Sequence, residues 1–310
     1  MLQENFLLQE VFFSAIGKDK GWTVDRVKGT GKEERGMREF SVVIKPLTPI
    51  WTGDEDRKAS RLRETGILGS LRWWYEALVR GLGGTACDPT NSNCDADNHC
   101  DACELFGCKG WSRKFRLEVR EIKTNDHPER YELRFIELRP MEDIEWKLLK
   151  DVLWIIKTYG AIGGKLAERN YGLIEVLIED ETVLEIAKVS REELDKYFKG
   201  KRETPTDAPD LKGFVFIKRA DNQLVKDLKQ ELDFLKGRMG KAKRYFAKKL
   251  PDGNLRLFVY GESKEESQKS EDESEKSKDE FERIKEFFIR KSISVKTGSD
   301  VINELLEGNK

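Results

Sequence analysis

The chain has 310 residues, which is enough for two domains of ordinary size. Its 57 Lys and Arg residues nearly balance its 58 Asp and Glu residues, so the net charge of -1 excludes a surface that attracts nucleic acid or membranes as a whole. A charged fraction of 37%, dominated by Glu, Lys and Arg, is typical of proteins from thermophiles. No apolar stretch is long enough to span a bilayer and no secretory signal is evident, so we expect a cytoplasmic protein without membrane partners.

The first half of the chain predicts strand, helix, two strands, helix and strand, which is the split βαβ order of a ferredoxin-like domain. Prolines end the first strand, and Thr65 is the expected N-cap of the first helix. Residues 1–37 precede these elements and predict a peripheral segment. The expected elements lie at 38–51, 67–84, 114–123, 131–139, 146–159 and 173–179.

The second half repeats this pattern less clearly, with strands expected at 213–219 and 254–263 and helices at 221–239 and 281–291. Residues 262–280 have almost no apolar side chains, which predicts a mobile insertion, with a charged helix as the alternative. The segment 212–219, KGFVFIKR, resembles the RNP1 pattern of RNA-recognition motifs, but it opens its domain instead of forming the third strand. We therefore expect Phe214 and Phe216 to lie in the core.

Five cysteines are crowded between residues 87 and 108, which favours a local metal site over a disulfide framework. Four of them follow the pattern C-x6-C-x5-C-x2-C, and a C-x2-C pair can supply two thiolates to zinc from one tight turn. His99 is a candidate substitute ligand, whereas Cys108 is expected to be buried beside Leu105 and Phe106. The favoured interpretation is a structural zinc, with disulfides or free thiols as alternatives, and its ligands are Cys87, Cys94, Cys100 and Cys103.

A glycine-rich loop, GAIGGKLAERNYG at 160–172, follows the second helix and does not fit the Walker phosphate-loop pattern. It still combines free backbone amides with Lys165, Arg169 and Tyr171, a combination that suits a sugar-phosphate chain. The alternative is a helix C-cap followed by a solvated turn.

Two other stretches carry basic residues with few acids, and one of them includes a tryptophan. In a nearly neutral protein such clusters favour a local nucleic-acid groove, although each one alone could be a solvated face. The first stretch contains Arg57, Lys58, Arg61 and Arg63, and the second contains Lys109, Trp111 and Arg113.

The helix at 67–84 contains two adjacent tryptophans that cannot both face the same core, because neighbouring helical residues point about 100° apart. We expect Trp74 to be mostly buried and Arg72 to reach a phosphate from the edge of the apolar stripe. Trp73 points outward together with Glu76 and Arg80, which favours an outside partner over cover by another part of the chain. The stripe itself consists of Leu68, Leu71, Tyr75, Leu78, Val79 and Leu82.

Signals for catalysis are weak, and we expect no enzyme activity. His127 precedes a proline in a turn with no nucleophile nearby in the sequence, so we expect a solvated histidine. Asp54 and Asp56 lie in the loop after the first strand, where an acid can position a metal or water, although solvation is the favoured role.

Four features together resemble the RAMP superfamily of CRISPR proteins: the strand with its Pro-rich end, the helix GSLRWWYEAL, the ELFG after the cysteines and the loop GGKLAERNYG. The resemblance spans about residues 38–180, and the helix and cysteine loop most resemble RAMP subunits of type III-B (Cmr) effector complexes.

This resemblance implies an α+β protein of two ferredoxin-like (RRM-like) βαββαβ domains, at 38–180 with a cysteine loop at 87–108 and at 181–310. It also implies a non-catalytic subunit that binds single-stranded RNA, contacts the guide RNA near its 3′ end, helps to capture target RNA and assembles with other CRISPR effector subunits. In related subunits an aspartate between the first strand and first helix cuts RNA, so an endoribonuclease that uses Asp54 or Asp56 is the alternative.

Overall fold

The computed structural model describes residues 37–53, 58–59, 61–88, 93–123, 129–179, 189–198, 208–237, 242–262 and 279–307. The predicted peripheral segment at 1–37 and the predicted insertion at 262–280 therefore lie almost wholly outside the described residues. Within the described part of the chain, no helix has both the length and the apolar character needed to cross a membrane.

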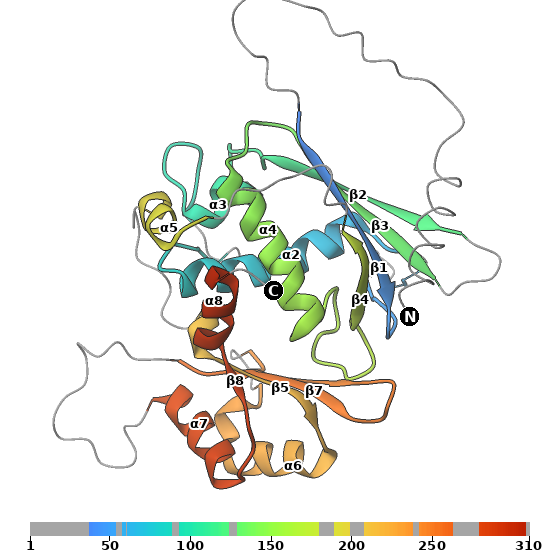
Figure 1. Ribbon diagram of the computed structural model, residues 1–310, viewed down its shortest axis with the longest axis vertical. Helices are drawn as coiled ribbons and strands as arrows, with labels where there is room; N and C mark the ends of the chain where they lie inside the picture. Colours follow the sequence, from blue (N-terminus) through green and yellow to red (C-terminus); the bar gives the residue numbers. More distant parts are fainter. Residues whose placement is uncertain are drawn as a thin grey trace, which may run out of the picture. The chain divides into compact units, whose positions relative to one another are not determined.

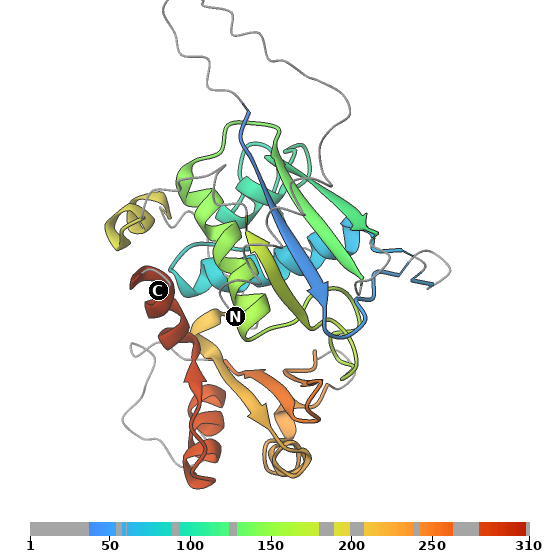
Figure 2. The same ribbon diagram turned by 45° about the vertical axis from the view of Figure 1, so that its right-hand side comes forward.

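The first half forms a four-stranded antiparallel sheet with the strand order β2-β3-β1-β4. Helices α2 and α4 lie on one face of this sheet (Figures 1 and 2). The order is that of a ferredoxin-like domain and confirms the prediction. Its elements are β1 (Glu39–Pro46), α2 (Glu64–Gly81), α3 (Asp101–Phe106), β2 (Phe115–Ile122), β3 (Arg130–Glu137), α4 (Asp143–Thr158) and β4 (Ile174–Glu179).

The second half forms another four-stranded antiparallel sheet, with the order β6-β7-β5-β8 and helices α6 and α7 on one face (Figure 1). The helix expected at 221–239 ends early, at Glu231, and strands β6 and β8 were not predicted. Asp221 and Asp279 cap α6 and α7 by accepting hydrogen bonds from first-turn amides. The elements are α5 (Arg191–Tyr197), η1 (Leu211–Gly213), β5 (Phe214–Ala220), α6 (Asn222–Glu231), η2 (Asp233–Leu235), β6 (Tyr245–Lys249), β7 (Leu255–Tyr260), α7 (Glu280–Arg290), β8 (Lys296–Thr297) and α8 (Gly298–Glu307).

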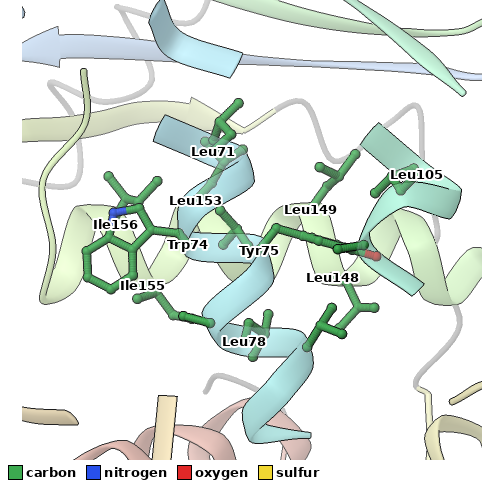
Figure 3. Packing of buried hydrophobic residues seen from close by; sticks show 14 of the residues in the cluster. Leu71, Trp74, Tyr75, Leu78, Leu105, Leu148, Leu149, Leu153, Ile155 and Ile156 are labelled. Atoms are coloured by element: carbon green, nitrogen blue, oxygen red, sulfur yellow. The ribbon is translucent and has the colours of Figure 1, made fainter. Parts of the chain in front are cut away.

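Both faces of the second sheet are buried, because successive side chains of a strand point to opposite faces. On β5, Val215 and Ile217 join the core beneath α6 and α7. Phe214 and Phe216 join the larger core that contains α2 and α4, so the prediction that both rings are core residues is confirmed. Figure 3 shows the α2 and α4 side chains of this larger core packed against one another.

Helix α2 begins one residue before the expected N-cap Thr65, with Arg63 as its N-cap residue, and it is buried on nearly every side. The predicted apolar stripe is buried throughout, and Trp74 is 0% exposed, which confirms both predictions. The outward expectation for the opposite side is wrong, because Glu76 and Arg80 are buried and Trp73 is half-buried. The aromatic face of the second sheet covers Trp73, whose ring centroid lies 6.0 Å from Phe214, 6.1 Å from Phe246 and 6.3 Å from Tyr260.

Candidate nucleic-acid interface and metal centre

The four cysteines of the predicted metal site come together in the structure. Their sulfur atoms all lie within 4.8 Å of one another, and three of the four side chains are buried. Zn–S bonds of about 2.3 Å in a tetrahedron separate the sulfurs by about 3.8 Å, so the group fits a metal ion. No disulfide joins these cysteines in the described part of the chain, and the Cys87 and Cys103 sulfurs lie 3.5 Å apart, far longer than a disulfide bond. These four residues, Cys87, Cys94, Cys100 and Cys103, could therefore hold a metal ion.

Arg72 lies against this cysteine group. Its guanidinium donates to Glu76 at 2.7 Å, to the Gly107 carbonyl at 3.0 Å and to the Cys103 sulfur at 3.3 Å. The expectation that Arg72 reaches a phosphate is therefore wrong, because its donors are directed into the protein. Sequence reasoning missed this arrangement because the cysteine loop lies 15 or more residues further along the chain.

The second predicted basic stretch lies beside the cysteine loop. Trp111 stacks on His99 with ring centroids 4.6 Å apart, and the guanidinium of Arg139 lies 4.1 Å from the Trp111 centroid. His99 bonds Glu104 at 2.6 Å and lies outside the group of four cysteines, so it does not act as a substitute ligand in this arrangement. Cys108 also lies outside that group, but it is half-buried and not fully buried as expected. Lys109 is exposed and Arg113 is half-buried.

The glycine-rich loop packs against Trp51 at the end of the first strand segment. The Gly164 amide donates to the Trp51 carbonyl at 2.7 Å, and a Cβ at Gly164 would come within 2.6 Å of the Trp51 ring. Residues 160–163 are buried, so the alternative of an ordinary solvated turn does not describe this part of the loop. The glycines are needed because the loop backbone approaches the indole closely.

Lys165 is the exposed cation of this loop, and it adopts a left-handed φ of 52°. Its ammonium lies 5.0 Å from the Trp51 ring centroid and 5.2 Å from the Tyr171 centroid. The structure thus brings together the predicted pair Lys165 and Tyr171 and adds Trp51, a residue that sequence analysis did not select. A cation between two aromatic faces offers both charge and stacking surfaces.

Basic side chains of the second sheet meet the same loop. Lys243 donates to the Ala167 carbonyl at 2.8 Å, Lys248 to the Glu168 carbonyl at 2.7 Å and Arg256 to the Gly160 carbonyl at 3.1 Å. Arg169 of the loop in turn donates to Asn222 at 2.6 Å. Sequence reasoning could not find these partners, because 76 or more residues separate the three donors from the loop carbonyls.

The cations around the loop repel one another. Burial and the neighbouring Lys243 lower the pKa of Lys248 to about 7, although Glu168 partly opposes the shift. Burial, Lys229 and Arg169 likewise lower the pKa of Lys243. We call Lys165, Arg169, Lys243 and Arg256 the loop cation group, which leaves out Lys248 because it is 0% exposed and its pKa of about 7 leaves it only partly charged at neutral pH. Glu168 compensates part of this charge, since its carboxylate lies 3.8 Å from the Lys165 ammonium, and the remaining concentration of positive charge favours the binding of an anion.

A pocket of about 450 Å³ lies between the Trp51 segment, the start of α2 and the glycine-rich loop. The basic stretch before α2 is tied to its wall, because the Arg63 amide donates to the Thr52 hydroxyl, which donates to the Arg61 carbonyl. The pocket is lined by Trp51, Thr52, Gly53, Thr65, Gly66, Gly69, Ser70, Trp73, Gly163, Gly164 and Leu166.

The first predicted basic stretch and the candidate catalytic residues lie partly outside the described residues. Lys58 and Arg61 are exposed, and Arg63 is half-buried. Asp54, Asp56, Arg57 and His127 lie outside the described residues. The predicted RNA contacts of the remaining residues stay predictions.

Comparison with known proteins gives one family match. A search of curated proteins gives no match. Among solved structures, the chain is similar to apo Cmr1 from Pyrococcus furiosus, with 14% identity, a TM-score of 0.45, and coverage of 84% of this chain and 98% of that one. The model of the RAMP superfamily matches residues 43–175, which include α2, the four cysteines and the glycine-rich loop that carried the resemblance. Residues 43–175 therefore form a domain of the RAMP superfamily.

Proposed function

We propose that this protein is a non-catalytic RNA-binding subunit of a type III-B CRISPR effector complex, which targets RNA under the direction of a guide RNA. The observation that carries the proposal is the loop cation group, which surrounds the glycine-rich loop of the RAMP domain beside Trp51 and Tyr171. Phosphates bind such a group through charge, and exposed aromatic rings can stack on unpaired bases.

The proposed RNAs are the guide, near its 3′ end, and the target, and the proposed protein partners are other subunits of the same complex. The sequence resemblance of helix α2 and the cysteine loop to Cmr-type RAMP subunits supports this assignment. Sequencing the RNA and identifying the proteins that co-purify from the native host tests it directly. Recovery of the chain without RNA and without CRISPR subunits would contradict this part of the proposal.

RNA binding is tested by titrating the purified protein with single-stranded RNA at several salt concentrations. Binding through phosphates releases counterions, so affinity should fall steeply with salt. Lys165→Ala and Arg169→Ala should each weaken binding and reduce the salt slope by about one. Lys123→Ala is the matched control, since this exposed lysine directly follows β2 and, among the described residues, its one ion pair is with Glu121 at 4.0 Å. Unchanged affinity and slope in both loop variants would remove the loop from the RNA interface.

Catalysis is tested in the same samples by adding magnesium or manganese. We expect binding without cleavage. Cleavage that disappears in Asp54→Ala or Asp56→Ala would instead establish a metal-dependent endoribonuclease, because an acid in this loop can position a metal or water.

We also propose that the four-cysteine group holds a structural zinc. The close approach of four sulfurs supports it, and the Cys87 amide and Arg72 guanidinium donate hydrogen bonds that stabilise thiolates. Metal analysis should find about one zinc per chain, and Cys100→Ser or Cys103→Ser should remove it. If protein purified without chelator contains no metal and its cysteines are bridged, disulfides form instead of a zinc site.

A further inference from the structure

The pocket between Trp51 and Trp73 has three features that together suit a ligand, as judged from the residues that the structure describes. The first is Gly69, in the middle of helix α2, where glycine lowers helix stability relative to alanine. Gly69 is exposed, and a Cβ there would meet no atom within 4 Å, so no neighbour among the described residues requires a glycine at this position. By contrast, a Cβ at Gly66 would come within 2.7 Å of Thr52, so close packing does require that glycine.

The second feature is Ser70, which also lines the pocket. Only 6% of Ser70 is exposed, and its hydroxyl has no hydrogen-bond partner within the described part of the chain. A buried hydroxyl without a partner is destabilising, and such groups in proteins are normally satisfied. A ligand with a polar edge would supply the missing hydrogen bond.

The third feature is the pair of half-buried indoles, Trp51 and Trp73, in the pocket wall. Trp51 is held in place, because a Cβ at Gly53 or Gly164 would come within 2.2 Å or 2.6 Å of its ring. The second-sheet aromatic rings hold Trp73 from its other side. Fixed aromatic walls beside space left by a glycine suit a flat aromatic ring.

We propose that this pocket receives one unstacked nucleobase of the bound RNA. The base packs on the indoles and occupies the space above Gly69, and its polar edge bonds the Ser70 hydroxyl. Lys165, whose ammonium lies 5.0 Å from the Trp51 ring centroid, is placed to meet a phosphate of the same nucleotide. Because a single hydroxyl can donate or accept, the pocket should bind different bases with little preference. This inference rests on the proposed RNA-binding function and adds a base-binding subsite to it.

The test compares intact single-stranded RNA with an abasic oligonucleotide of the same length, which keeps the phosphates and lacks the bases. The variant Gly69→Leu places a side chain in the pocket from a position where a Cβ meets no atom within 4 Å, and Gly69→Ala is its matched control. Gly69→Leu should weaken binding of intact RNA on the order of tenfold, with an unchanged salt slope, because no phosphate contact is lost. Its affinity for abasic RNA should match that of the unmodified protein. Ser70→Ala, which removes only the hydroxyl, should weaken binding of intact RNA in the same selective way.

Equal binding of intact and abasic RNA, or intact-RNA binding that neither Gly69→Leu nor Ser70→Ala weakens, would overturn the base pocket. The proposed RNA-binding function would survive that result, because salt-dependent binding through phosphates would remain. A complete lack of RNA binding by the unmodified chain would refute both. Melting temperatures of the variants separate a filled pocket from a damaged fold, since Gly69→Ala should melt at or above the temperature of the unmodified protein.

Discussion

The contact between Trp74 and Gly160 links helix α2 to the start of the glycine-rich loop, and it can be tested by a double-mutant cycle. Trp74 is 0% exposed, and its indole N–H donates to the Ala161 carbonyl at 2.9 Å. A Cβ at Gly160 would come within 2.5 Å of the Trp74 ring. Gly160 therefore has to be glycine because the indole occupies the space of a methyl group.

The magnitudes follow from this packing. Trp74→Leu loses part of a fully buried ring and leaves the Ala161 carbonyl without its donor, which should destabilise the fold by about 3 kcal/mol. Gly160→Ala should cost about 2 kcal/mol, because a rigid ring in the core cannot move away. In the double variant the shorter leucine makes room for the methyl group, so adding Gly160→Ala should cost about 0.5 kcal/mol or less.

Urea unfolding of the four proteins gives each free energy of unfolding and hence a coupling energy of about 1.5 kcal/mol. Gly69→Ala is the control for glycine replacement, since its methyl group meets open space and should be neutral or stabilising by up to about 1 kcal/mol. This reasoning would be refuted if Gly160→Ala lowered the free energy of unfolding by the same amount with tryptophan and with leucine at position 74.

Three further predictions concern single side chains. Lys248→Met should raise the free energy of unfolding at pH 6 more than at pH 10. The folded-state pKa of Lys248, about 7, lies below the usual 10.5, so between these values the unfolded chain binds more protons and the stability of the unmodified protein rises with pH, by roughly 3–5 kcal/mol. Urea unfolding at both pH values should show that this rise is absent in the variant. Trp73→Ala should lower the free energy of unfolding by about 2 kcal/mol, less than Trp74→Ala, because Trp73 is half-buried; equal losses by thermal melting would mean that both rings are full core residues. Arg72→Ala should release zinc at a lower chelator concentration than the unmodified protein, because the variant lacks the hydrogen-bond donor to the Cys103 sulfur, and it should keep its helix content in circular dichroism. An unchanged chelator titration would show that Arg72 does not stabilise the bound zinc.

Local patterns were sufficient for the secondary structure of the first half, except for the short helix α3, and for the approach of the four cysteines. The apolar stripe of α2, the order of strands and helices along the chain and the four-cysteine spacing each follow from residues close together in the chain. Periodicity sets which side of a helix faces the sheet, and the spacing of cysteines in one loop limits which sulfurs can meet.

Only the tertiary structure decided what covers the other side of α2 and what surrounds the glycine-rich loop. Trp73 points away from the first sheet, as the helical angle requires, but the second sheet covers it, and periodicity contains no information about such a second layer. Arg72 donates to the Cys103 sulfur, and Lys248 on strand β6 donates to the carbonyl of Glu168, which lies 80 residues earlier in the chain. Such contacts depend on how the two sheets pack against each other. Side-chain burial and charge repulsion are set by distances in space, and the order of residues along the chain does not specify those distances.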